Sequence, residues 1–220
     1  AVTPRFAPTS TPEQLSLAGQ LFKEYPDLYM HTHLSENLKE IDWVKELFPE
    51  QKGYLDVYDH FELLGERSVF AHGVHLCDDE CQRLSETGSA IAFCPTSNLF
   101  LGSGLMDWQR YARRAKPVRV AAATDVGGGT NYSMLRTMDE GYKVIALNGE
   151  KINPLASFWQ ITRGNAEALS MERNIGTLDE GSDADLVVLD ARATPAMALR
   201  METVTTLAEE LFLLQTMGDD

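Results

Sequence analysis

The 220-residue sequence predicts an α/β fold that forms part of a (β/α)8 TIM-type barrel and holds roughly its second half. Strand-like and helix-like runs alternate four times along the chain, after a strand remnant at its start, which is typical of parallel βαβ units. Polar residues also follow three of the strand-like runs, where the carboxyl ends of barrel strands would bring them together. A complete barrel needs about 250 residues, so four repeats amount to about half of one.

The individual elements follow from the spacing of apolar residues and from residues that start or stop helices. Short apolar runs predict strands at 28–33, 68–71, 90–94 and 118–124. Helical spacing predicts helices at 36–48, 54–64, 78–87, 107–115, 133–147 and 153–169. Ser35 and Asp78 are the expected N-terminal caps of two of these helices, and Gly88 is the expected C-terminal stop of one.

The pattern changes at about residue 170, so we divide the chain into a barrel portion, 1–170, and a second segment, 171–220. In the second segment, turn-like residues at 176–178 and an apolar run within 181–190 predict a β-strand outside the alternation. A helix is expected at 203–217.

Composition and charge disfavour several classes of function. The net charge is −14 and the isoelectric point is about 4.7, which argue against nucleic-acid and anionic-membrane partners but not against a small neutral substrate. No apolar run approaches the ~18–20 residues of a transmembrane helix. Three cysteines make no disulfide framework, so we expect a reducing, cytoplasmic compartment. The chain opens without methionine at a strand remnant, so we expect an excerpt of a longer protein.

Three strand ends carry the residue types of a hydrolytic metal site. His33 ends the first strand, His72 the second and Asp125 the last, and Glu36 follows His33 by three residues. A catalytic zinc ion takes imidazole and carboxylate ligands and keeps one position for water, whose pKa it lowers from ~16 to about 7. One carboxylate can take the proton of that water, and a separate carboxylic acid can deliver a proton to a substrate nitrogen. Asp125 suits the first role and Glu36 the second.

Other chemistry-bearing residues are weaker candidates. His31 lies two residues before the strand-end histidine and shares its strand face. His75 is expected to be a structural loop residue, and His60 is expected to face solvent from a helix. Cys77 and Cys81 have no second ligand pair, so we predict no cysteine-based zinc site.

The glycine run 127–129 is not a phosphate-binding loop. It lacks the Lys-Ser/Thr ending of a P-loop and the spacing of a dinucleotide-binding motif. Because glycine has no side chain, we expect the run to let the backbone approach a planar ligand closely.

Several short motifs, spread over nearly the whole chain, occur together and in this order in one known family. They are Pro4-Arg5-Phe6, His33-Leu34-Ser35-Glu36-Asn37, His72-Gly73, the run from Cys94 to Gly104, and Thr124-Asp125-Val126-Gly127-Gly128. Together they resemble guanine deaminases, zinc enzymes of the amidohydrolase superfamily. The resemblance implies a distorted barrel of the amidohydrolase type, of which the chain holds roughly strands 4–8, plus part of a small β-sandwich that 181–190 enters and 171–220 helps to form.

The resemblance also implies a reaction, the hydrolysis of guanine to xanthine and ammonia in purine catabolism. His33 and Asp125 would ligate zinc from the fifth and eighth strands. His72 would hydrogen-bond the hydrolytic water, Asp125 would accept the proton of that water, and Glu36 would protonate the purine ring.

The substrate would be held by Arg5 and Phe6 together with His33, Glu36 and Asp125. A guanidinium group suits a purine carbonyl, and an aromatic ring suits the face of the base. Members of the family are commonly homodimers, so we expect a homodimer of the full-length protein.

Two zinc ligands of the family have no counterpart in the chain. They come from a His-x-His motif on the first strand, and His31-Thr32-His33 cannot replace it, because His33 is assigned to the fifth strand and Glu36 follows it. Two protein ligands are too few for tightly bound catalytic zinc, so we expect activity to require the rest of a longer protein. Two alternatives stay open: an amidohydrolase acting on another aminated heterocycle, such as a pterin, a triazine or another purine, and a non-catalytic half-barrel that binds a ligand or partner.

Overall fold

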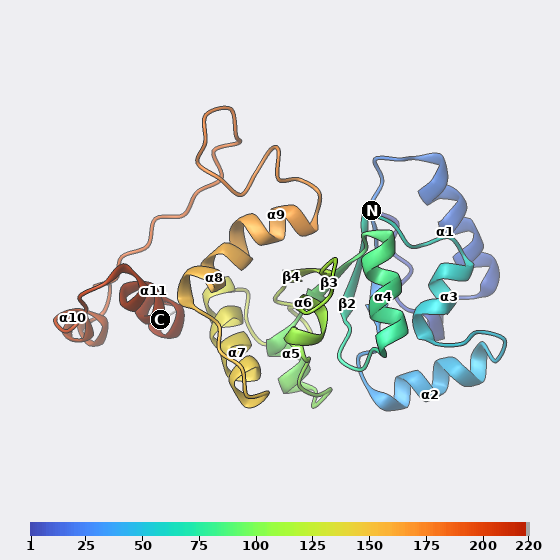
Figure 1. The fold of residues 1–220 in the computed structure, drawn as a ribbon, viewed down its shortest axis with the longest axis horizontal. Helices are drawn as coiled ribbons and strands as arrows, with labels where there is room; N and C mark the ends of the chain where they lie inside the picture. The colour runs from blue at the N-terminus through green and yellow to red at the C-terminus, as the bar shows by residue number, and fades with distance from the viewer. Residues whose placement is uncertain (219–220) are drawn as a thin grey trace.

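A four-stranded parallel sheet forms the centre of the computed structural model, which describes residues 1–218 (Figure 1). The strands pair in the order of the sequence and are β1 (Met30–Leu34), β2 (Ser68–His72), β3 (Ala90–Phe93) and β4 (Arg119–Ala122). The strand remnant at the start of the chain is a single parallel bridge between Val2 and Met30. The four predicted strands and their parallel arrangement are therefore confirmed.

Helices follow each strand and cover the sheet (Figure 1). The α-helices before residue 170 are α1 (Pro12–Glu24), α2 (Leu38–Leu47), α3 (Tyr54–His60), α4 (Asp78–Thr87), α5 (Pro95–Phe100), α6 (Trp108–Ala112), α7 (Met134–Leu147), α8 (Pro154–Trp159) and α9 (Asn165–Ala168). A π-helical turn, Gln160–Gly164, joins α8 to α9 into one helical stretch, as the sequence predicts. Within residues 1–218, no helix is long and apolar enough to cross a membrane.

The two faces of the sheet are packed differently because successive strand residues point to opposite sides. On the outer face, Phe70, Ile91 and Phe93 join one large apolar core with residues of α1, α3, α4 and α6. On the inner face, the strands contribute smaller side chains to a second cluster, among them Val69, Ala71, Ala92 and Ala121. The inner face, which in a closed barrel would surround the axis, also carries the half-buried His33.

Two predicted helix caps are wrong. Ser35 has a left-handed backbone (φ +48°) that ends β1, and α2 begins after Asn37, whose side chain accepts a hydrogen bond from the Glu40 N–H. Asp78 is the first helical residue of α4, and the cap is Cys77. Gly88 is confirmed as the C-terminal stop of α4, because it takes the left-handed conformation (φ +72°) that favours glycine.

Two helices before residue 170 were not predicted from the sequence. In α1, Thr11 accepts a hydrogen bond from the Gln14 N–H and Pro12 stands in the first turn, a start signal that the sequence contains. In α5, Pro95 follows the end of β3 and begins a helix, because the fixed φ of proline suits the first helical position.

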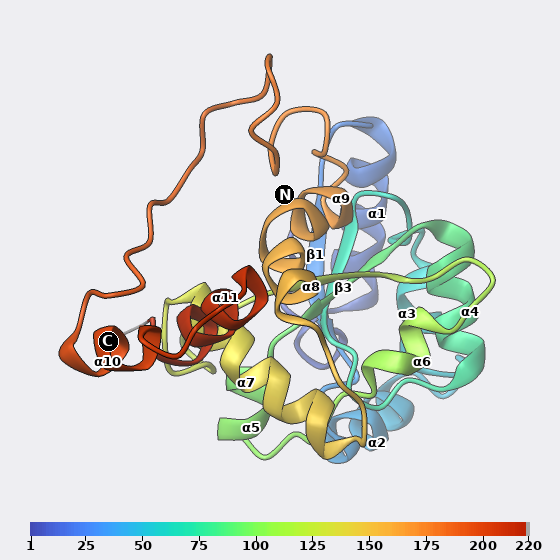
Figure 2. The same ribbon diagram turned by 60° about the vertical axis from the view of Figure 1, so that its left-hand side comes forward.

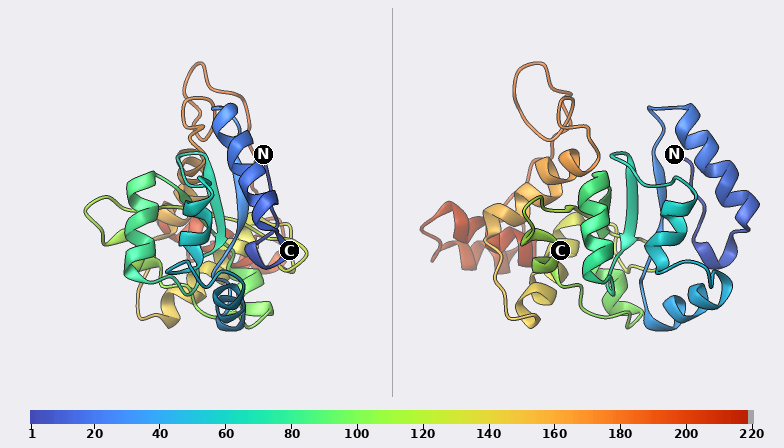
Figure 3. Two further views of the ribbon diagram at one scale, coloured as in Figure 1. Left: turned by 90° about the vertical axis from the view of Figure 1, so that its right-hand side faces the viewer. Right: turned by 45° about the vertical axis from the view of Figure 1, so that its right-hand side comes forward.

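The strand predicted within 181–190 is wrong in the described structure. The segment between α9 and α10 (Pro195–Met201) is irregular and loops away from the sheet (Figures 2 and 3). Val187 and Val188 are 83% and 86% exposed. A strand needs a neighbour for its backbone hydrogen bonds, and within residues 1–218 none pairs with this segment.

The helix predicted at 203–217 is shorter than expected, and α10 before it was missed. The predicted helix corresponds to α11 (Leu207–Met217), which is capped by Thr206 and packs against α7 and α8 (Figure 2). The last two residues of the predicted segment 171–220 lie outside the described residues.

Candidate metal centre

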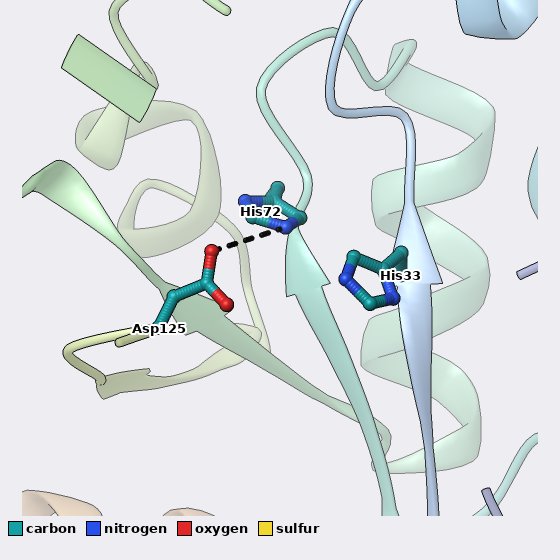
Figure 4. A group of neighbouring side chains, drawn as sticks. All are labelled: His33, His72 and Asp125. Atoms are coloured by element: carbon teal, nitrogen blue, oxygen red, sulfur yellow. Dashed lines mark ion pairs between the residues drawn. The ribbon is translucent and has the colours of Figure 1, made fainter. Parts of the chain in front are cut away.

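Three side chains from separate strands meet at the carboxyl edge of the sheet (Figure 4). His33 lies in β1, His72 is the last residue of β2, and Asp125 follows β4 by three residues. One potential ligand atom from each of them lies within 4.8 Å of the other two. His72 Nε2 is 3.9 Å from Asp125 Oδ2. The structure thus brings together the three strand-end residues that the sequence analysis singled out.

Left-handed turns place two of these side chains. His72 has φ +74° and is followed by Gly73 at φ +58°, and Asp125 has φ +47°. Residues other than glycine adopt this conformation at a cost of order 1–3 kcal/mol, and such residues cluster at functional sites. The turn at His72 ends β2, and the turn at Asp125 follows β4. The side chains of His72 and Asp125 both lie near His33 as a result (Figure 4).

Both histidines have one ring nitrogen occupied and the other aimed into the cluster. His33 Nδ1 donates a hydrogen bond to the Arg5 carbonyl oxygen (2.7 Å), and His72 Nδ1 donates to Asn98 Oδ1 (2.9 Å). A proton on Nδ1 leaves the Nε2 lone pair free, which is the tautomer that metal-binding histidines use. With one carboxylate beside them, the donor set fits zinc.

Glu36 lies at the same opening. Its Oε2 atom is 3.7 Å from His72 Nε2, and its Oε1 atom accepts a hydrogen bond from Ser103 Oγ (2.8 Å). The Glu36 side chain is 15% exposed and that of Asp125 is 28% exposed, so both can meet a small molecule that enters from solvent.

Arg5 and Phe6 lie beside the cluster. The Phe6 ring centroid is 6.1 Å from that of His33, and the Arg5 guanidinium carbon is 5.2 Å from the Phe6 centroid. On its other side, Phe6 meets Trp43 edge-on at 6.2 Å. An aromatic ring therefore stands beside His33, and a guanidinium group lies against that ring.

The weaker candidates stay outside the cluster. His75 Nε2 bonds the Ser103 carbonyl (2.8 Å), as expected of a structural residue, and His60 is exposed at the end of α3. His31 is exposed on β1. Burial raises the pKa of the Cys81 thiol to about 11 and that of Cys94 to about 12, so neither offers a thiolate at neutral pH.

The glycine run has a role within the loop itself. A Cβ atom on Gly128 would lie 2.8 Å from Ser97 Oγ and 3.0 Å from Asp125 Oδ2. The missing side chain lets the loop close over Asp125, and the close approach to a planar ligand stays a prediction.

Asn98 and Ser103, the hydrogen-bond partners of His72 and Glu36, were not predicted as site residues from the sequence. Both residues are buried, and both belong to the run from Cys94 to Gly104. The sequence contained no signal that singled these two out, because the run also holds the polar residues Thr96 and Ser97. Which side chain each one contacts depends on the tertiary fold.

Comparison with known proteins places the chain in a family. The model of the amidohydrolase family matches residues 1–217. The chain belongs to the amidohydrolase family. It is 49% identical over 220 residues to the guanine deaminase of Escherichia coli K12, and 39% identical over 199 residues to that of Rattus norvegicus.

Solved structures agree with the sequence comparison. The E. coli guanine deaminase superposes with a TM-score of 0.97 over 99% of the chain. The guanine deaminase of C. acetobutylicum, solved with bound guanine in its active site, has 28% identity and a TM-score of 0.86 over 98% of the chain. The chain spans about half the length of the relatives it matches: 50% of the E. coli protein and 43% of the rat protein.

Proposed function

We propose that the full-length protein containing this chain is a zinc-dependent guanine deaminase, which hydrolyses guanine to xanthine and ammonia. The observation that carries the proposal is the cluster of His33, His72 and Asp125 at the carboxyl edge of the sheet, with Glu36 beside it. The substrate is inferred from relatives that are 49% and 39% identical and are guanine deaminases.

His33 Nε2 and the Asp125 carboxylate would hold the zinc ion. When bound, zinc acts as a Lewis acid and lowers the pKa of water to about 7. Catalytic zinc in proteins commonly takes three protein ligands and one water molecule or substrate. We therefore propose that further ligands come from residues outside this chain, and that His72 contacts the water.

Three side chains handle the water and the protons: Asp125, His72 and Glu36. Asp125 accepts the proton of the attacking water, and the free Nε2 lone pair of His72 accepts a hydrogen bond that orients it. Glu36, as an acid, protonates the purine ring nitrogen next to the amino-bearing carbon. Because Ser103 occupies Oε1 of Glu36, the proton is carried on Oε2, the oxygen nearer His72. The amino group takes the proton held by Asp125 and leaves as ammonia, while the new hydroxyl group on the ring carbon returns a proton to Glu36. Both side chains are thereby regenerated, and guanine plus water balance xanthine plus ammonia.

The base would lie against Phe6, with the Arg5 guanidinium bonded to its carbonyl oxygen. We also propose that the full-length protein is a cytoplasmic homodimer, and that residues 1–170 belong to its barrel and 171–220 to its accessory β-sandwich and C-terminal helix. These proposals rest on the family resemblance and on the composition.

The test is a substrate panel with the zinc-loaded full-length protein. Xanthine formation from guanine, absent in the Asp125→Asn variant, is the expected result. Deamination of a pterin, a triazine or another purine with guanine left unchanged would support an amidohydrolase of different specificity. A protein that binds no zinc and converts no member of the panel would support a binding module.

A further inference from the structure

Tyr58 lies directly behind the residues proposed to hold the base and the metal. It is fully buried on α3, and its ring is 5.6 Å from that of Tyr54 and 5.5 Å from that of Phe70. The ring belongs to the large outer core, whereas the hydroxyl group reaches the carboxyl end of β1.

The Tyr58 hydroxyl touches three backbone or side-chain groups beside the site. It accepts a hydrogen bond from the Ala7 N–H (3.0 Å) and donates one to the His33 carbonyl oxygen (2.9 Å). The Thr32 hydroxyl lies 3.2 Å away from it. One phenol oxygen therefore bridges the chain after Phe6 and the strand that carries the proposed zinc ligand.

Residues 5–7 are also hydrogen-bonded to β1 at their other end, through Arg5. The Arg5 carbonyl oxygen accepts hydrogen bonds from the His33 N–H (3.2 Å), from His33 Nδ1 (2.7 Å) and from Thr32 Oγ1 (3.0 Å). Phe6 thus stands between two fixed points, the Arg5 carbonyl and the Ala7 N–H. Its backbone is extended (φ −168°, ψ 162°), so its position follows from where those two points are held.

We propose that Tyr58 is a positioning residue, whose hydroxyl sets the spacing between the base-holding segment (Arg5 and Phe6) and the zinc ligand His33; this inference rests on the proposed function. The packing of the ring does not require the hydroxyl, because Phe70 and Tyr54 contact the ring faces. All three hydroxyl contacts go instead to residues in or next to the site.

The test compares Tyr58→Phe with Tyr29→Phe in the zinc-loaded full-length protein. Tyr29→Phe is the matched control, because the Tyr29 hydroxyl donates to the Leu169 carbonyl at the opposite end of β1. Each variant loses one hydroxyl and keeps its ring. We expect Tyr58→Phe to raise KM for guanine about tenfold, the size of one lost buried hydrogen bond, with zinc content unchanged. Tyr29→Phe should leave KM within about twofold, although both variants lose some thermal stability.

Equal changes of KM in the two variants, or none in Tyr58→Phe, would overturn the inference. A crystal structure of Tyr58→Phe gives a readout that does not depend on turnover. The separation of the Phe6 and His33 rings, 6.1 Å in the parent chain, should change, and an unchanged separation would count against the proposal. If the parent protein leaves guanine unchanged, the proposed function fails, and the crystal structure still decides the role of Tyr58.

Discussion

The two ends of the four strands are built in opposite ways. At the amino end, the Arg119 side chain donates to the carbonyl oxygens of Glu66, Gly88 and Glu167 and to Ser170 Oγ, so one cation joins four segments of the chain. At the carboxyl end, imidazole and carboxylate groups gather with no cation of the chain bonded among them in residues 1–218.

Left-handed backbones occur at both ends, and at the carboxyl end they belong to residues of the candidate site. His72 and Asp125 have them there, whereas at the amino end Ser170, a partner of Arg119, has φ +54°. The carboxyl group of Glu40 in the first turn of α2 is buried. Burial raises the pKa of Glu40. Barrel enzymes carry chemistry at the carboxyl end of the strands and stability at the amino end. In this chain one arginine joins segments through four hydrogen bonds at the amino end, and imidazole and carboxylate groups gather at the carboxyl end.

The largest expected effect is the loss of catalysis in Glu36→Gln. The amide keeps the shape of the side chain and a partner for Ser103 but cannot deliver the proton, so kcat for guanine should fall by about 10²- to 10⁴-fold. Glu86→Gln on the surface of α4 is the control and should be neutral. Steady-state kinetics of the full-length protein measures both, and a Glu36→Gln variant with parental kcat would remove Glu36 from the mechanism.

The second prediction concerns the amino end. Arg119→Met should lower the free energy of unfolding by about 3 kcal/mol, because it leaves partly buried carbonyl groups without donors, while KM and zinc content stay unchanged. Arg83→Met is the control, since it removes a surface pair with Asp59 and should cost no more than about 1 kcal/mol. Denaturant unfolding of the full-length protein compares them. A loss of zinc from Arg119→Met with stability intact would contradict the division between the two ends.

Two buried serines extend the comparison to neutral side chains. Ser103→Ala removes the hydrogen bond to Glu36 and should lower kcat about tenfold with little change in stability. Ser89→Ala, at the amino end of β3, removes the acceptor of the Gly65 N–H and should lower stability by about 1 kcal/mol with kcat unchanged. Kinetics and unfolding measured on both variants should show opposite patterns, and matching patterns would argue against separate roles for the two ends.

The smallest predicted effect depends on pH. Because burial raises the pKa of Glu40, the folded state binds this proton more tightly than the unfolded chain, and stability falls as the pH rises above the unfolded value near ~4.3. Glu40→Gln cannot ionise, so it should be more stable than the parent at pH 8, and the difference should shrink as the pH is lowered to 4. Glu46→Gln, exposed on the same helix, is the control. A stability difference that does not vary with pH would show that ionisation of Glu40 is not its cause.

Much of this arrangement could be predicted from local sequence. The strands of the sheet follow from short apolar runs, and His33, His72 and Asp125 were found because each stands at or just after a strand end. The partners could not be found this way, since Ser103 lies 67 residues from Glu36 and Tyr58 lies 25 residues from His33. Such contacts depend on how separate helices pack, which no local pattern contains.

The wrong strand prediction has a related cause. An apolar run such as 186–189 predicts a strand only if another strand lies beside it, and within residues 1–218 this run is exposed and unpaired. The wrong cap at Ser35 shows the limit at a smaller scale. Ser35 is a good capping residue by type, but its left-handed backbone belongs to the turn that ends β1.

The most direct test of the account is anomalous diffraction at the zinc absorption edge from crystals of the zinc-loaded full-length protein. We expect one zinc ion at ~2.0–2.2 Å from His33 Nε2 and from a carboxylate oxygen of Asp125, at the carboxyl end of the strands. Zinc bound elsewhere, or no zinc with His33 and Asp125 arranged as they are here, would contradict it.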